Sequence, residues 1–196
     1  MSLVAVVMAA GYSKRFYGDK LIFPICGVPA ILRVIHSLMD TGISDIMVVL
    51  RREEKSVEEI MPDDITLIYN DNAGEGMASS LRLAAQVSID SGSDLMTVLG
   101  DQPLVSPKSL SKLVHELGKG EKGLISFSIN GSPVSPVIFT RPYLHEIMKL
   151  KGDMGGKSIL LGNKSDLKLL EFEDPWEGVD IDTRDAAEKM NGHLGC

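Results

Sequence analysis

The 196-residue sequence has few cysteines, few aromatic residues and no excess of positive charge. Its two cysteines, Cys26 and Cys196, give no sign of a disulfide framework, and no cysteine or histidine group has zinc-site spacing. The formal net charge of −7 argues against a nucleic-acid-binding surface. The apolar run near the N-terminus, about six residues, is too short for a signal sequence or a membrane span. These absences predict a cytoplasmic protein with neither nucleic acid nor a membrane as its partner.

The length and composition that remain are typical of one α/β domain. Hydrophobic residues make up 44% and charged residues 24%, which are ordinary values for such a protein. A chain of this length can bury a full core, and it contains no recognisable linker, internal repeat or low-complexity segment. We therefore expect a single domain over residues 1–196.

Short apolar runs alternate with amphipathic segments along the chain. Strands are predicted at residues 3–8, 46–50, 65–69, 94–99, 124–128, 134–139 and 179–181. Helices are predicted at residues 29–41, 77–89, 107–117, 141–150 and 157–161, and after a Thr183 cap. The alternation indicates a doubly wound, mostly parallel sheet. In such sheets ligands bind at the carboxyl ends of the strands, where Gly11, Asn70 and Asp101 are expected to gather.

The loop after the first strand carries the strongest functional signal. Gly11 lets the backbone approach a ligand closely, and a basic cluster follows at residues 14–20, including Arg15 and Lys20. Backbone N–H groups and nearby cations are typical of a polyphosphate site, although an ordinary strand-to-helix turn with solvated lysines is the alternative. A Walker loop is excluded because six residues separate Gly11 from Gly18. The dinucleotide fingerprint is also absent.

Three aspartates are candidate metal ligands. Asp101 ends an apolar strand, and its carboxylate suits Mg²⁺, which prefers one or two carboxylates with phosphate oxygens and water. A simple Asx-turn at Asp101 is the alternative. Asp180 and Asp182 are spaced to project to one face of a strand and together invite a cation. The alternative there is that Asp182 or Thr183 caps the last helix.

Five segments, in order, resemble the signatures of the molybdenum cofactor nucleotidyltransferases, nearer the cytidylyl branch than the guanylyl branch. They are residues 9–29 (beginning AAGYSKR), 75–81 (EGMASSL), 100–104 (GDQPL), 150–156 (LKGDMGG) and 180–185 (DIDTRD). The resemblance covers nearly the whole chain. It implies a Rossmann-like, three-layer α/β/α nucleotidyltransferase fold. The implied nucleotide-binding half is about 1–105 and the acceptor-binding half about 106–196.

This resemblance implies Mg²⁺-dependent transfer of CMP from CTP to a molybdopterin-type cofactor, with release of pyrophosphate. The implied catalytic residues are Arg15, Lys20 and Asp101, and the implied Mg²⁺ ligands are Asp101 and Asp182. The implied nucleotide-binding residues are Met8, Ala9, Ala10, Gly11, Arg15, Lys20, Asn70, Gly76 and Ser80. Ser135 and Asp153 are the implied acceptor-binding residues. A molybdoenzyme or its chaperone is the implied receiver of the product.

The chain departs from the family pattern at a few positions, and alternatives remain open. Tyr17 replaces a glycine, Ser135 stands where the cytidylyl branch has a histidine, and Lys157 replaces an arginine. GTP as donor, or a sugar phosphate or phospholactate as acceptor, is the alternative within the fold. A non-catalytic nucleotide sensor and a structural interaction module are the alternatives outside it. Arg51 is either a base or ribose contact or part of a solvated helix start.

Overall fold

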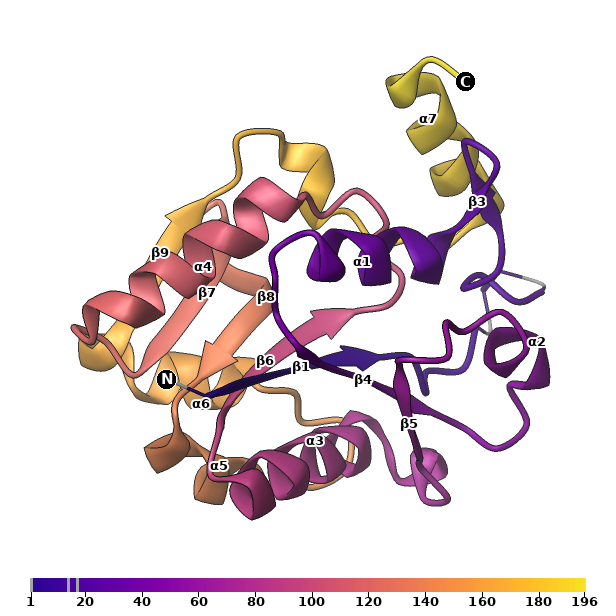
Figure 1. Ribbon diagram of the computed structural model, residues 1–196. Coiled ribbons are helices and arrows are strands. Elements are labelled where there is room, and N and C mark those ends of the chain that lie inside the picture. The colour runs from indigo at the N-terminus through magenta and orange to yellow at the C-terminus, as the bar shows by residue number, and fades with distance from the viewer. Residues whose placement is uncertain (1, 14, 17) are drawn as a thin grey trace.

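The computed structural model describes residues 2–13, 15–16 and 18–196, which form a central sheet between two layers of helices (Figure 1). Lys14 and Tyr17, which belong to the predicted phosphate loop, lie outside the described residues. This three-layer α/β/α arrangement confirms the expected fold class.

Seven strands form the main sheet in the order β5-β4-β1-β6-β8-β7-β9. Their bounds are β1 (Leu3–Met8), β4 (Asp45–Leu50), β5 (Thr66–Tyr69), β6 (Asp94–Leu99), β7 (Leu124–Ile129), β8 (Ser132–Phe139) and β9 (Leu167–Glu171). Of the pairings in the described chain, those of β8 with β6 and β7 are antiparallel, and the others in this sheet are parallel. A separate hairpin joins β2 (Pro24–Ile25) to β3 (Val28–Pro29). The carboxyl ends of β1, β4 and β6 therefore meet at one edge.

The pleat of each strand sends alternate side chains into two hydrophobic clusters. One cluster holds Ala5 and Val7 of β1 beneath α1 (Ala30–Met39) and α4 (Pro107–Lys119). The other holds Val4 and Val6 beneath α3 (Met77–Ser91), α5 (Arg141–Ile147) and α6 (Lys157–Gly162). Figure 1 shows these helix groups on opposite faces of the sheet. The near-continuous apolar run of β1 reflects burial on both faces.

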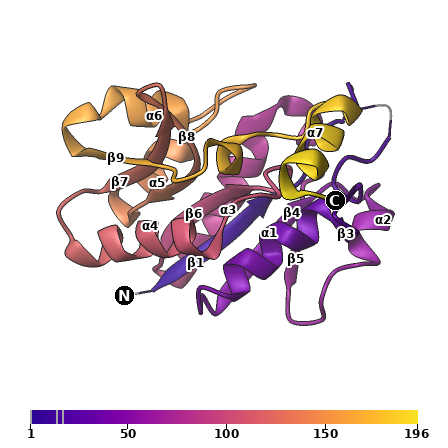
Figure 2. The same cartoon turned by 90° about the horizontal axis from the view of Figure 1, so that it is seen from above.

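The remaining elements are short or peripheral. They are α2 (Lys55–Glu58), the 3₁₀ turns η1 (Ala73–Glu75), η2 (Lys164–Asp166) and η3 (Pro175–Gly178), and the last helix, α7 (Arg184–Leu194). Both views place α7 next to β3 and apart from the two helix layers (Figures 1 and 2). No helix in the described part of the chain is both long and apolar enough to cross a membrane.

Several local predictions are confirmed by hydrogen bonds or backbone angles. The Ser106 side chain accepts from the Ser109 N–H at 3.1 Å and caps α4. The Thr183 hydroxyl accepts from the Ala186 N–H at 3.2 Å and caps α7. The β7–β8 turn has positive φ at both Asn130 (52°) and Gly131 (72°), as a two-residue hairpin of the primed type requires.

The predicted strand at residues 179–181 is wrong, and neither strand β9 nor the disulfide was predicted. Residues 179–181 do not form a strand; the segment instead runs alongside the loop after β6, where the Ile181 N–H donates to the Asp101 carbonyl at 2.8 Å. The sheet edge is taken by β9, whose alternating Leu167–Glu171 run the sequence analysis did not assign. The two cysteines also form a disulfide, although they lie 170 residues apart in the sequence. Their pairing depends on where α7 docks, and no sequence spacing reveals that.

Candidate functional site

A cavity of about 550 Å³ lies at the carboxyl ends of β1 and β6 and extends towards β8 and α6. It falls within the usual size range of ligand pockets. All but one of the site residues predicted from the sequence lie in its walls. These are Met8, Ala9, Ala10, Gly11, Arg15, Lys20, Gly76, Ser80, Asp101, Ser135, Asp153 and Asp182. Segments separated by more than a hundred residues thus contribute to one cavity.

The first wall is the backbone that leaves β1. The Ala9 N–H donates to the Val49 carbonyl at 2.9 Å, and the Gly100 N–H donates to the Met8 carbonyl at 3.1 Å. These bonds fix the start of the loop between its two neighbouring strands. A Cβ built on Gly11 would meet no atom of the described residues beyond its chain neighbours within 4 Å, and Gly11 faces the cavity. Protein packing therefore does not require glycine there, and the missing side chain leaves room for a ligand against the backbone.

The second wall is a chain of two cations and two carboxylates. Lys20 donates through Nζ to Asp101 Oδ2 and lies 3.6 Å from Asp182 Oδ1. Arg15 Nη2 donates to Asp182 Oδ2 at 2.9 Å. The Lys20 and Asp101 side chains are only 14% and 16% exposed, whereas Arg15 is 73% exposed. The inner pair is consequently shielded from solvent and should be stronger than the outer pair, which water and salt screen.

Asp180 lies next to these charged side chains and accepts a hydrogen bond from a buried glutamine. The Gln102 Nε2 donates to Asp180 Oδ1 at 2.8 Å. Burial, followed by the nearby charges of Asp101 and Asp182, raises the pKa of Asp180 to about 6. The raised pKa means that the charged form of Asp180 is disfavoured at this position, so a cation bound nearby would stabilise it.

The carboxylates of Asp101 and Asp182 suit Mg²⁺ or Mn²⁺ when the ligand supplies the other oxygen atoms. Asp101 and Asp182 present carboxylate oxygens to the cavity, the ligand type that hard divalent cations prefer. Within the described ranges, no group of three or more His, Cys, Asp or Glu side chains forms a preformed metal cage. Mg²⁺ is usually bound by one or two carboxylates and completed by substrate phosphates and water. The site therefore suits a metal that arrives with, or is completed by, a phosphorylated ligand.

The raised pKa of Asp180 predicts a pH-dependent effect on stability. A carboxyl whose folded pKa is about 6, against an ordinary 3.8, stabilises the fold below pH 3.8 and loses that contribution as the pH rises through 6. Asp180→Asn should therefore raise the melting temperature at pH 7.5 in metal-free buffer by about 2–4 °C, corresponding to about 1 kcal/mol.

Thermal unfolding at pH 7.5 and pH 4 with a chelator present measures this effect, and the gain should shrink towards pH 4. The control is Asp185→Asn, because Asp185 is exposed on α7 and pairs with Lys189 at 2.7 Å. Equal melting temperatures for Asp180→Asn and the unmodified protein at pH 7.5 would show that burial does not destabilise this carboxylate.

The described contacts show what the carboxylates of Asp182, Asp153 and Asp101 do locally. Thr183, not Asp182, caps α7, so the Asp182 carboxylate remains available to Arg15 and Lys20. Asp153 does not cap α6, whose first turn follows Gly156 without a side-chain cap. The carboxylate of Asp101 pairs with Lys20. Each carboxylate thus faces the cavity, as the functional hypothesis requires.

Asn70 is the one predicted site residue that does not line the cavity. It is 3% exposed, and its Nδ2 donates to both the Ser79 and Ser80 hydroxyls at 2.8 Å. Its Oδ1 accepts from the Asn72 N–H at 2.9 Å. With its amide already engaged, Asn70 is placed to orient Ser80, which does face the cavity.

The third wall lies where β6 and β8 separate. Their pairing stops at Thr97 and Val137, and beyond it the Ser135 hydroxyl accepts from the Leu99 N–H at 3.2 Å. Ser135 therefore bridges the gap between the strands at the cavity floor. The wall beyond it is mainly apolar. It contains Met77, Pro133, Val134, Val137, Phe139 and Leu160, with Lys157 beside them.

Sequence reasoning missed some of these residues for a clear reason. Phe139 and Val137 belong to a buried strand, and their pattern shows only core packing.

Tyr12 lines the cavity and lies under the guanidinium of Arg51, with 4.2 Å from Cζ to the ring centroid. Arg51 itself is not in the cavity wall, so its influence on a ligand would pass through Tyr12. A tyrosine beside the loop glycine was the available signal.

Comparison with known proteins decides the family. The model of the MobA-like NTP transferase domain matches residues 5–167, which is most of the chain. This protein belongs to that family. The family resemblance recognised from the sequence is thereby confirmed.

Individual relatives from the comparisons share about a quarter or less of their aligned residues with this chain. A protein of Thermococcus sibiricus named "Probable molybdenum cofactor guanylyltransferase" is 24% identical, covering 98% of this chain and 99% of the relative. The "Bifunctional protein GlmU" of Symbiobacterium thermophilum is 26% identical over 58% of this chain, and the match covers 24% of that protein. The chain thus spans about a quarter of the GlmU relative. The manganese complex of Rv0371C from Mycobacterium tuberculosis shares the fold, with a TM-score of 0.80 at 20% identity, covering 98% and 99% of the two chains.

Proposed function

We propose that this MobA-like protein is a Mg²⁺-dependent nucleotidyltransferase that moves CMP from CTP to the phosphate of a molybdopterin-type acceptor. The observation that carries the proposal is the chain of paired charges, Arg15–Asp182 and Lys20–Asp101, in the wall of one cavity. The nucleotide binds mainly through residues 1–105 and the acceptor mainly through residues 106–196, with Asp182 reaching back into the nucleotide half.

The paired charges exchange partners when the nucleotide binds. Asp101 and Asp182 would hold Mg²⁺, which would supply positive charge to the phosphate under attack. Lys20 and Arg15, released from these carboxylates, contact the β- and γ-phosphates, Arg15 as a fork and Lys20 as a point charge. Both cations also stabilise the negative charge that develops on the departing pyrophosphate. The loop backbone around Gly11 accommodates the nucleoside against β1.

The reaction needs no general base. An acceptor phosphate monoester has a second pKa near 6 and is mostly dianionic at neutral pH. One of its oxygens attacks the α-phosphorus and forms a new P–O bond, while the bond from the α-phosphorus to the bridging oxygen breaks and pyrophosphate leaves with the electron pair. The role of the protein is positioning and charge stabilisation, which agrees with a cavity whose described lining residues include no histidine or cysteine.

The wall near β8 favours an acceptor with a flat organic ring. Val134, which is half-buried, and Met77, which is exposed, offer few hydrogen-bond partners, so the hydroxyl groups of a sugar phosphate would lose their hydration there without compensation. A pterin ring can pack on such a surface. Lys157, beside this wall, then contacts the acceptor phosphate, and Ser135 and Asp153 border the same part of the cavity.

GTP is the second candidate donor. The full-length relative from Thermococcus sibiricus carries the name of a guanylyltransferase. One motif residue that favours cytidine by resemblance, Gln102, is 2% exposed and engaged with Asp180. The Ala9-Ala10 pair, which also favours cytidine, does face the cavity.

Pyrophosphate release tests the proposal. The purified protein is incubated with Mg²⁺ and CTP, GTP, ATP or UTP, with and without molybdopterin or its molybdenum-loaded form. We expect release only with acceptor present, and at least about tenfold faster with CTP than with the other nucleotides.

The other outcomes distinguish the alternatives. Fastest release with GTP would replace the proposed donor by the second candidate. Nucleotides that raise the melting temperature without pyrophosphate release from any acceptor would indicate a sensor. If no nucleoside triphosphate shifts the melting temperature with Mg²⁺, the proposed use of the cavity is wrong.

A further inference from the structure

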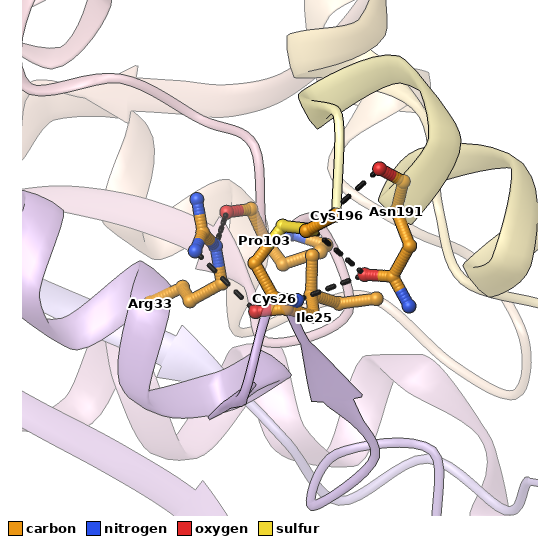
Figure 3. Close-up of a disulfide and its surroundings, with 6 residues drawn as sticks. All are labelled: Ile25, Cys26, Arg33, Pro103, Asn191 and Cys196. Carbon is orange, nitrogen blue, oxygen red and sulfur yellow. Dashed lines mark hydrogen bonds between the residues drawn. A yellow bond between two sulfur atoms is a disulfide. The ribbon is translucent and has the colours of Figure 1, made fainter.

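The disulfide between Cys26 and Cys196 lies outside the cavity but joins two of the segments that build it. Cys26 is in the turn between β2 and β3, and Cys196 follows α7 (Figure 3). Their Cα atoms are 5.6 Å apart, within the normal range for a disulfide. Asn191 on α7 contacts both residues, since its Oδ1 accepts from the Cys26 N–H at 2.8 Å and its carbonyl accepts from the Cys196 N–H at 3.0 Å.

Helix α7 has little hydrophobic surface with which to dock. Of its 11 residues, only Ala187 and Met190 are buried. Ordering a helix costs conformational entropy, and short helices are held in place mainly by the packing of an apolar face. A covalent link at the far end of α7 therefore contributes much of what keeps this helix on the β2–β3 hairpin.

The core beneath α7 is continuous with the charged wall of the cavity. Ala187 and Met190 belong to a small buried cluster that also contains Phe16 and Ile181. Phe16 follows Arg15 in the sequence, and Ile181 lies between Asp180 and Asp182. The segment with Asp182 leads directly into α7, which starts one residue after the Thr183 cap. Movement of α7 would thus reach both partners of the Arg15–Asp182 pair.

A second connection runs from the hairpin to Asp101. On α1, Arg33 donates through Nη1 to the Ile25 carbonyl at 3.4 Å and through Nε to the Pro103 carbonyl at 3.2 Å. Figure 3 shows Arg33 and Pro103 beside the disulfide. Pro103 lies two residues after Asp101. The turn that holds Cys26 is therefore fastened to both carboxylate-bearing segments.

We propose that the Cys26–Cys196 disulfide is a redox-controlled clamp, which holds α7 and the Asp180–Asp182 segment against the phosphate loop and loosens both when reduced. The effect on ligand binding rests on the proposed function of the cavity; the effect on α7 does not. Cys196 is exposed, so an external thiolate can reach its Sγ.

The chemistry is thiol–disulfide exchange with a dithiol reductant. One reductant thiolate attacks Cys196 Sγ, forms a mixed disulfide and releases the Cys26 thiolate, which takes up a proton. The second reductant thiol then displaces Cys196 and closes the oxidised reductant. Two electrons and two protons pass from the dithiol to the protein in total.

Hydrogen exchange measured by mass spectrometry tests the clamp on the full chain. Protein oxidised with glutathione disulfide is compared with protein reduced by dithiothreitol, after thiol titration under denaturing conditions. We expect no thiol in the oxidised sample and two in the reduced one. Peptides covering residues 179–196 should exchange at least about fivefold faster after reduction, whereas the α5 peptide should not change.

The matched control is the double variant Cys26→Ser/Cys196→Ser, which should exchange like the reduced protein and not respond to dithiothreitol. Two thiols in the oxidised sample, or equal exchange of residues 179–183 in both forms, would overturn the clamp. Affinity for Mg²⁺–CTP and Mg²⁺–GTP is then measured in both forms, and reduction should weaken it at least about threefold.

The two proposals fail in different ways. Equal nucleotide affinity in both forms would leave the proposed function intact and remove the link between the clamp and the site. Absence of nucleotide binding in both forms would contradict the proposed function, while faster exchange of residues 179–196 on reduction would still support the clamp.

Discussion

Replacing Asp101 with asparagine is expected to lower nucleotidyl transfer by about 100-fold or more while leaving the fold intact. Asparagine keeps the shape of the side chain but removes the negative charge that a divalent metal requires. It also leaves Lys20 without its closest ionic partner. Loss of one transition-state charge contact at an enzyme site typically costs 100- to 1,000-fold in turnover. The measurement is pyrophosphate release at saturating nucleotide over a range of Mg²⁺ concentrations.

A surface substitution serves as the control for this loss. Asp90→Asn removes the same charge from an exposed position on α3, where the carboxylate accepts from Gln86 at 2.8 Å. It should leave turnover within about twofold of the unmodified protein. Asp101→Asn should still unfold cooperatively, but at a lower temperature than Asp90→Asn, because Lys20 loses its closest ionic partner. Turnover of Asp101→Asn within tenfold of the unmodified protein at ordinary Mg²⁺ concentrations would remove Asp101 from the mechanism.

Gly76→Ala is expected to destabilise the protein by about 3 kcal/mol or more. Gly76 has φ of +98° and ψ of −178°, a backbone conformation that essentially only glycine adopts. A Cβ there would lie 2.5 Å from the Gly152 backbone and from Asp153 Oδ1. The collision would push apart the start of α3 and the 152–153 loop, which the Ala78 N–H now joins through the Gly152 carbonyl at 3.0 Å.

Chemical unfolding of both Gly76→Ala and Gly92→Ala compares a glycine that has both a close backbone neighbour and a glycine-only conformation with one that has a left-handed conformation alone. Gly92 also has a positive φ, +65°, at the end of α3, but a Cβ there would meet no atom within 4 Å. Gly92→Ala should lower the free energy of unfolding only by the penalty for an alanine in the left-handed conformation, about 1–2 kcal/mol. Equal losses for the two variants would show that the 152–153 loop does not pack tightly on Gly76.

Much of the fold could be predicted from local sequence patterns. The runs at Leu3–Met8 and Asp94–Leu99 are apolar because both faces of these central strands are buried, and their bounds agree with the prediction. The Asn130-Gly131 turn was readable because few residue pairs adopt positive φ at both positions. Such features depend on neighbouring residues alone.

Other features depend on contacts between distant segments and left no local trace. The run at 179–181 looked like a strand, but its hydrogen bond goes to the loop at Asp101. The Cys26–Cys196 pairing depends on the position of α7 beside the β2–β3 hairpin, where Asn191 accepts a hydrogen bond from the Cys26 N–H. The sequence was enough to predict that the residues following β1 and β6 lie together at the carboxyl ends of these strands. Side-chain roles such as that of Asn70, which supports Ser80 from beneath, required the three-dimensional arrangement.

Anomalous diffraction from crystals grown with Mn²⁺ and a non-hydrolysable analogue of CTP or GTP tests the central claim most directly. The account predicts a manganese peak between the carboxylates of Asp101 and Asp182. It also predicts that the β- and γ-phosphates contact Arg15 and Lys20 in the cavity at the carboxyl ends of β1 and β6. A nucleotide whose triphosphate lies away from Arg15 and Lys20, or a manganese ion bound without Asp101, would contradict it.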